Sequence, residues 1–149
     1  MSNLYFCFSL QELTKANRIK NMSARKNFTT GSPWEDIIGY CRAVKIGNTI
    51  EIAGTTAGKD TNGNAIEGLY NQTKAILEKL SGVLQDAGAS VNDVVRTRMF
   101  LTDISQWEEA AKAHGEVFKD IKPVTTIVEV SKLIGPEILI EIEVTAITG

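Results

Sequence analysis

The chain has 149 residues, of which 43% are apolar and 23% are charged, a composition that suits one domain with a hydrophobic core of useful size. Its formal net charge of −2 provides no general attraction to a phosphate backbone, so we expect no nucleic-acid partner. Two cysteines and one histidine cannot assemble the usual structural zinc sites, so we expect no metal and no cofactor, and two thiols without a disulfide framework favour a reducing compartment such as the cytoplasm.

The first 27 residues lack the alternation of the later chain, and we interpret them as an N-terminal extension before a single domain of residues 28–149. Within the extension, the segment SLQELTKANRIK favours a short helix. The apolar stretch Leu4–Leu10 has neither a basic start nor a small-residue cleavage site, so it is not typical of a signal peptide. No segment approaches the roughly 18 to 20 apolar residues that cross a bilayer, and we expect a soluble protein without a membrane partner.

The later chain alternates strand and helix patterns. Gly47-Asn48 is a turn pair between two apolar runs, which predicts a β-hairpin, and Gly88 ends the most regular helical pattern. The predicted strands cover residues 41–46, 49–54, 94–101, 124–130 and 138–146, and the predicted helices cover residues 69–87 and 104–118. This order predicts an α+β domain in which two helices cover one face of a mixed sheet.

Side chains alternate along a strand, so each predicted strand has two faces. One face of the last strand is apolar and belongs under the helices, and it carries Ile138, Ile140, Ile142 and Val144. The same count groups Val95 with Met99 and Leu101. The charged candidates for the other sheet face are Glu51, Arg96, Arg98, Glu129, Glu141 and Glu143. Two interpretations stay open: a solvated outer face, or a seam between identical subunits in which arginines pair with glutamates.

Two segments, IGYCRAVKIGNTIEIAG and KPVTTIVEVSKLIGPEILIEIEVTAI, resemble the opening hairpin and the C-terminal signature of the YjgF-type reactive intermediate deaminases (RidA/YjgF), also called endoribonuclease L-PSP-like proteins. The resemblance covers roughly residues 33–147. It implies a fold like the Bacillus type of chorismate mutase and a homotrimer of barrel form, with a small-molecule cleft at each subunit interface. The resemblance therefore favours the subunit seam over the solvated face.

In active deaminases of this family the signature strand begins with proline, a small residue and an arginine that grips the carboxylate of a 2-imino acid. Here Thr125 stands where that arginine is expected, and one hydroxyl cannot replace a bidentate, charged clamp. Ile127 stands where a cysteine is frequent. The family's acidic residue, thought to position the attacking water, matches Glu141, and its cleft tyrosine matches Tyr40.

Further candidate contacts of the cleft follow from the same resemblance. Ala53 replaces a small polar residue before the cleft glycine Gly54, and Thr55 comes next. Arg98 offers a replacement cation, with an ion pair in the seam as the alternative role. His114, in the run Ala-His-Gly-Glu, offers proton transfer near neutral pH, with a structural role on its helix as the alternative.

Three functions follow from these residues. The first is a trimeric small-molecule-binding protein with clefts near Tyr40, Gly54, Thr125 and Glu141. The second is an enamine or imine deaminase, a hydrolase in which Arg98 or His114 anchors the substrate. The third is a ribonuclease or translation inhibitor, which the negative net charge and the lack of a basic patch disfavour.

Overall fold

The computed structural model describes residues 24–149, so the helix predicted within the N-terminal extension lies outside the described residues. The elements in chain order are β1 (Arg25–Phe28), α2 (Pro33–Ile38), β2 (Ala43–Ile46), β3 (Thr49–Thr55), α3 (Leu69–Asp86), η1 (Val91–Asp93), β4 (Val94–Leu101), η2 (Ile104–Gln106), α4 (Trp107–Phe118), β5 (Val124–Glu129) and β6 (Ile140–Ile147). No helix of these residues is long and apolar enough to cross a bilayer.

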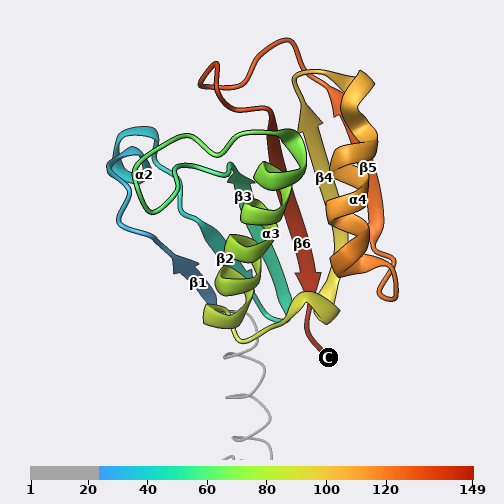
Figure 1. Cartoon of the computed structure of the whole chain (residues 1–149). Helices are drawn as coiled ribbons and strands as arrows, with labels where there is room; N and C mark the ends of the chain where they lie inside the picture. Colours follow the sequence, from blue (N-terminus) through green and yellow to red (C-terminus); the bar gives the residue numbers. More distant parts are fainter. Residues whose placement is uncertain (1–23) are drawn as a thin grey trace, which may run out of the picture.

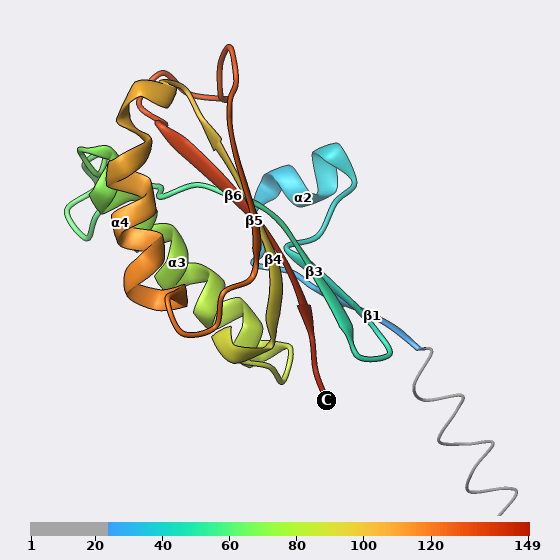
Figure 2. The same cartoon turned by 90° about the vertical axis from the view of Figure 1, so that its right-hand side faces the viewer.

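One six-stranded sheet of order β1-β2-β3-β6-β4-β5 forms the body of the domain (Figure 1). All neighbouring strands are antiparallel except β4 and β5, which are parallel. The helices α3 and α4 cover one face of this sheet, and α2 is not part of that layer (Figure 2). The predicted α+β fold, with two helices over one face of a mixed sheet, is confirmed.

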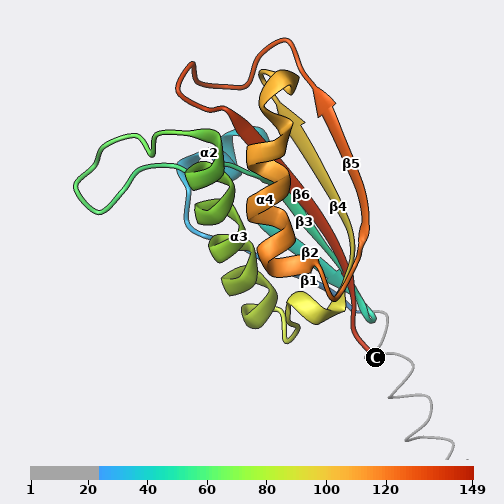
Figure 3. The same ribbon diagram turned by 45° about the vertical axis from the view of Figure 1, so that its right-hand side comes forward.

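The core lies between the sheet and the two long helices (Figure 3). The side chains of Ile140, Ile142 and Val144 on β6 are almost completely buried, as the alternation predicted. From the helix side, α3 presents apolar residues at three- and four-residue spacing, such as Ile76, Leu80 and Leu84. The opposite face of the sheet is not covered by α3 or α4 (Figure 3). It carries charged residues of β3, β4 and β6.

Two elements at the start of the domain were not predicted. Strand β1 pairs with β2, so the boundary predicted between residues 27 and 28 falls inside a strand. Helix α2 begins at Pro33, whose fixed φ suits a first helical turn, and is followed by Gly39, whose φ of +78° caps its C-terminus. Both elements are short, and a four-residue strand or a six-residue helix produces too little periodicity to be recognised.

Two details of the predicted sheet faces are corrected. A register shift between Val94 and Arg96 inserts one extra residue in β4, so Val94 is buried and Val95 is exposed. Glu129 pairs in register with the buried Leu101 and accepts a hydrogen bond from the backbone N–H of Ile104 at 2.9 Å. Glu129 therefore belongs to the helix side of the sheet and not to its charged face.

Candidate functional site

A cavity of about 930 Å³ opens where β3 ends. Five of the predicted site residues line it: Tyr40, Ala53, Gly54, Thr55 and Glu141. Its other walls come from the loop before α2, from α2 itself and from one side of α3. The structure thus brings together residues from both segments that carried the family resemblance.

A β-bulge in β3 shapes this cavity. Ile52 pairs with Val144 and Thr55 with Ile142, so Ala53 and Gly54 together face a single β6 residue. The bulge interrupts the ladder between β3 and β6. It therefore leaves backbone carbonyls of β3 that need other hydrogen-bond partners.

Gly54 allows the Glu141 carboxyl to lie directly against the β3 backbone. A Cβ atom built on Gly54 would lie 1.9 Å from Oε1 of Glu141, which no pair of non-bonded atoms tolerates. Burial raises the pKa of Glu141, the neighbouring Glu143 raises it further, and the positive charge of Arg42 opposes both effects. The Glu141 carboxyl is thus a half-buried acid whose proton affinity is increased, which suits general acid or base chemistry.

Arg42 is a cavity residue that sequence reasoning missed. Its Nη1 donates to the carbonyl oxygen of Gly54 at 2.8 Å and to Oγ1 of Thr55 at 3.1 Å, and Nη2 contacts the Tyr40 hydroxyl at 3.4 Å. The guanidinium therefore satisfies the carbonyls that the bulge releases. Its spacing of two residues from Tyr40 was the available signal, because such residues share one side of an extended chain.

The loop that forms the outer wall of the cavity is held by Glu35 of α2. The carboxylate of this buried side chain accepts hydrogen bonds from the backbone N–H and hydroxyl of Thr30, both at 3.0 Å, and from the N–H of Gly31 at 3.2 Å. The hydrogen bonds from Thr30 are the main cause that lowers the pKa of Glu35. Thr30 and Trp34 of this segment line the cavity, so Glu35 fixes the position of that wall.

Three other predicted residues lie at the β4–β5 edge of the sheet and not in the cavity. Oγ1 of the fully buried Thr97 lies 3.0 Å from Nε2 of His114 and 3.0 Å from Oγ1 of Thr125. Burial lowers the pKa of His114, so its imidazole is neutral near pH 7. Ile127 packs against the core on the same side of β5, and Thr125 brings this chain of hydrogen bonds to the exposed edge.

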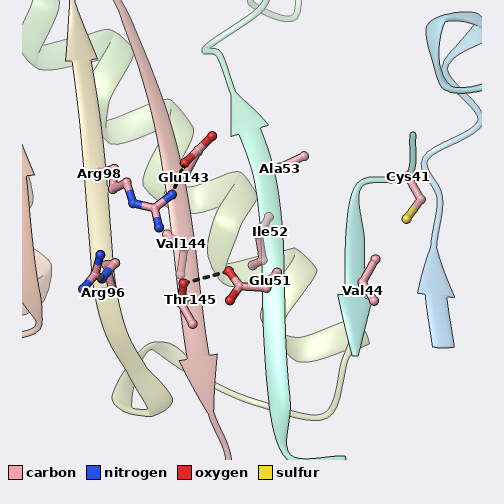
Figure 4. Close-up of a pocket in the computed structure, with 10 residues that line it drawn as sticks. All are labelled: Cys41, Val44, Glu51, Ile52, Ala53, Arg96, Arg98, Glu143, Val144 and Thr145. Carbon is pink, nitrogen blue, oxygen red and sulfur yellow. Dashed lines mark hydrogen bonds and ion pairs between the residues drawn. The ribbon is translucent and has the colours of Figure 1, made fainter. Parts of the chain in front are cut away.

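Arg98 occupies a third position, on the open face of the sheet. Its Nη1 donates to Oε2 of Glu143 at 2.8 Å, and about half of the Arg98 side chain is exposed. Figure 4 shows these two side chains turned toward each other, with Arg96 beside them and Glu51 bonded to Thr145. They surround a shallow hollow of about 300 Å³. Within one chain, Arg98 is therefore an ion-pair partner and does not reach the cavity around Gly54.

The family described as Endoribonuclease L-PSP matches residues 31–148. A protein of Streptomyces coelicolor is 34% identical over 129 residues, which cover 85% of this chain and 94% of that protein. A RutC family protein of Pyrococcus abyssi is 36% identical over 120 residues, 80% of this chain and 93% of the relative. The chain belongs to the Endoribonuclease L-PSP family. The crystal structure of a YjgF/YER057c/UK114 family member from Mycobacterium tuberculosis shares 42% identity, with a TM-score of 0.77 over 84% of this chain and 100% of that one.

Membership in the Endoribonuclease L-PSP family agrees with the resemblance seen in the sequence and with the chorismate-mutase-like fold. Family membership alone does not say what the residues of the cavity around Gly54 do. Those roles follow from the contacts described above and are open to direct measurement.

Gly54→Ala tests the packing of Glu141 against the bulge. The added methyl group must displace the carboxyl or the strand, so we expect the free energy of unfolding to fall by about 1–3 kcal/mol. Gly115→Ala on α4 is the matched control, because a Cβ there meets no atom within 4 Å and alanine favours a helix. Denaturant unfolding of both variants measures the difference, and equal stabilities would contradict the packing argument.

The titration of Glu141 tests its electrostatic environment. Glu143→Gln removes a like charge and should lower the pKa of Glu141, whereas Arg42→Gln removes a cation and should raise it. Because the folded state holds this proton to a higher pH than the unfolded chain, ionisation of Glu141 reduces stability as pH rises between the two pKa values. Side-chain carboxyl NMR shifts followed against pH measure these changes. Glu116→Gln, at an ion pair between the long helices, is the control that should leave Glu141 unchanged.

Proposed function

We propose that this protein is a homotrimer that binds a small molecule in a cleft completed at each subunit interface. The observation that supports the proposal is that two of the candidate site residues, Glu141 and Thr125, lie apart within one chain. Glu141 lies on the open face of β6, whereas Thr125 lies on the helix side of the edge strand β5. A ligand that contacts both groups needs a second copy, whose β5 edge closes the cavity around Gly54.

The open face of the sheet supports contact between copies. It carries an exposed ion pair, Arg98 with Glu143, and the adjoining edge strand exposes Val124 and Val128. Apolar side chains without cover are typical of a surface that a second subunit buries, and a charge on such a surface has to be paired when it is buried. We extend the proposal to a cytoplasmic protein, since the half-buried Cys41 forms no disulfide within residues 24–149.

Sedimentation velocity tests the oligomer. We expect a species of three times the chain mass of 16.3 kDa, and a monomer would remove the basis of an inter-subunit cleft. Arg98→Glu sets two like charges against each other at Glu143 and should shift the protein toward monomer. Lys112→Glu, an exposed change on α4, is the matched control and should leave the trimer intact.

A second function, hydrolysis of an enamine or imine, is favoured by the half-buried Glu141 carboxyl with its raised pKa. In this role Glu141 directs a water molecule to the carbon of the C=N bond, and ammonia leaves. None of the three residues considered as substrate anchors is free to bind a carboxylate with a charge. Thr125 carries no charge, Arg98 is paired with Glu143, and His114 lies against Thr97.

Ammonia release from imines generated by an amino acid oxidase tests this second function. We expect little release by the native protein and at least about tenfold more by Thr125→Arg, because a charge-assisted bidentate contact returns. The double variant Thr125→Arg with Glu141→Gln should lose the gain. Activity of the native protein equal to that of Thr125→Arg would mean that another residue already anchors the substrate. No release by either protein would favour binding without this chemistry.

Ribonuclease activity, which the family's name suggests, is disfavoured for this chain. The net charge is −2, and RNA binding relies on basic surfaces that neutralise phosphates. Of the two exposed arginines of β4, Arg96 and Arg98, the second is already paired with a glutamate.

A further inference from the structure

Two cations line the cavity around Gly54 without an ion-pair partner. Arg42 lies just before β2, and Lys79 lies on α3. Neither forms an ion pair with any carboxylate of residues 24–149. The charge of Arg42 acts on the carboxyls of Glu35 and Glu141, whose pKa values it lowers, but without a direct ion pair. Two cations without a directly bound carboxylate on one concave surface favour a bound anion.

Arg42 keeps N–H donors free after its structural contacts. A guanidinium carries five N–H groups. Its Nη1 serves the bulge, through Gly54, Thr55 and a longer contact of 3.4 Å to the Ala53 carbonyl. Its Nη2 makes one long contact to Tyr40, and Nε has no hydrogen-bond partner among the described residues. One side of the guanidinium therefore binds the β3 bulge, while the N–H groups on the other side remain available to a ligand.

Lys79 contributes a second donor to the same surface. Its Nζ donates to the carbonyl oxygen of Thr56 at 3.2 Å and to that of Ala57, which leaves one of its three N–H groups without a partner in the described chain. Burial lowers the pKa of Lys79, and the charge of Arg42 lowers it further, so the two cations lie close enough to repel each other. An anion placed between them relieves that repulsion.

The remaining walls define the kind of anion. Trp34 is 56% exposed and Ile38 is 63% exposed, and both line the cavity with Val83. Exposed apolar side chains in a concave site favour a ligand with an apolar part. Two acidic residues, Asp86 and Glu141, also line the cavity, and their charge disfavours a ligand with more than one negative group.

We infer that Arg42 and Lys79 form a carboxylate-binding subsite for a small monocarboxylate whose apolar part packs against Trp34 and Ile38. The inference rests on the proposed small-molecule function and names the class of ligand. In this arrangement the positive charge comes from the β2 and α3 side of the cavity, next to Glu141, and not from position 125 on the edge strand.

Binding of three probes to the full-length protein tests the subsite: phenylacetate, its neutral isostere phenylacetamide, and inorganic phosphate. We expect phenylacetate to bind at least about tenfold more tightly than phenylacetamide, because hydrogen bonds to charged groups are the stronger ones. Lys79→Gln and Arg42→Gln should each remove most of that preference, and Arg42→Lys should keep part of it. Titration calorimetry gives the affinities, and the NMR signal of the Trp34 indole reports contact with the cavity.

Lys74→Gln is the matched control, since Lys74 lies on the same helix but pairs with Glu116 outside the cavity. If Arg42→Gln disturbs the bulge, Lys79→Gln alone decides the test, because Lys79 forms its hydrogen bonds with Thr56 and Ala57 and not with Ala53 or Gly54. An unchanged preference in Lys79→Gln would overturn the inference, and so would tighter binding of phosphate than of phenylacetate.

Failure of the subsite and failure of the proposed function give different results. Equal binding of phenylacetate and phenylacetamide, with shifts of the Trp34 signal, would refute the carboxylate subsite and keep a small-molecule cavity. Absence of binding by all probes would refute the subsite for this ligand class. The oligomeric state and the ammonia assay test the proposed function independently of these probes.

Discussion

The candidate site depends on one irregularity in the sheet, the extra residue in β3 opposite Glu143. This bulge ends the regular ladder between β3 and β6 and turns the carbonyls of Ala53 and Gly54 toward other donors. A glycine at its second position removes the side chain that would otherwise fill the space of the Glu141 carboxyl. The guanidinium of Arg42 then completes the arrangement by binding the released carbonyls. A regular ladder at this position would leave neither a place for Glu141 nor free carbonyls for the half-buried Arg42 beside it.

The long elements of the fold were predictable because their patterns repeat many times. The helix pattern of residues 69–87 and the strand pattern of residues 94–101 contain enough periods to be recognised, and the observed bounds agree with both to within a residue. Single insertions are different, because a bulge changes the side-chain faces of a strand without changing its composition. For that reason Val95 was assigned to the wrong face of β4. Glu129 was misplaced for a different reason: β5 pairs with β4 without a bulge, but the alternation along β5 does not say which of its faces joins the helix side of the sheet.

The site was predictable in part for a related reason. Tyr40, Gly54 and Glu141 line one cavity. They could be predicted because residues of matching type stand at matching positions in the two segments that resemble the family. Lys79 carried no such signal, and Arg42 had only its spacing of two residues from Tyr40. Lysine and arginine are frequent on protein surfaces, and only the three-dimensional contacts distinguish a cation that lines a cavity from one that faces solvent. The separation of Thr125 from Glu141 was equally hidden, because the sheet order places β4 between β5, which carries Thr125, and β6, which carries Glu141.

Threonine at position 125 has structural consequences that an arginine could not reproduce. Its hydroxyl lies 3.0 Å from that of Thr97, which in turn meets the neutral imidazole of His114, so a buried polar chain is satisfied without any charge. A guanidinium at the same edge would carry its charge to a surface where the proposed neighbouring subunit packs. In the inferred arrangement, the cations that recognise a ligand and the Glu141 carboxyl beside them belong to one chain and line one cavity. Their relative position is then fixed by the fold of a single subunit, and the interface between copies has only to close the cavity.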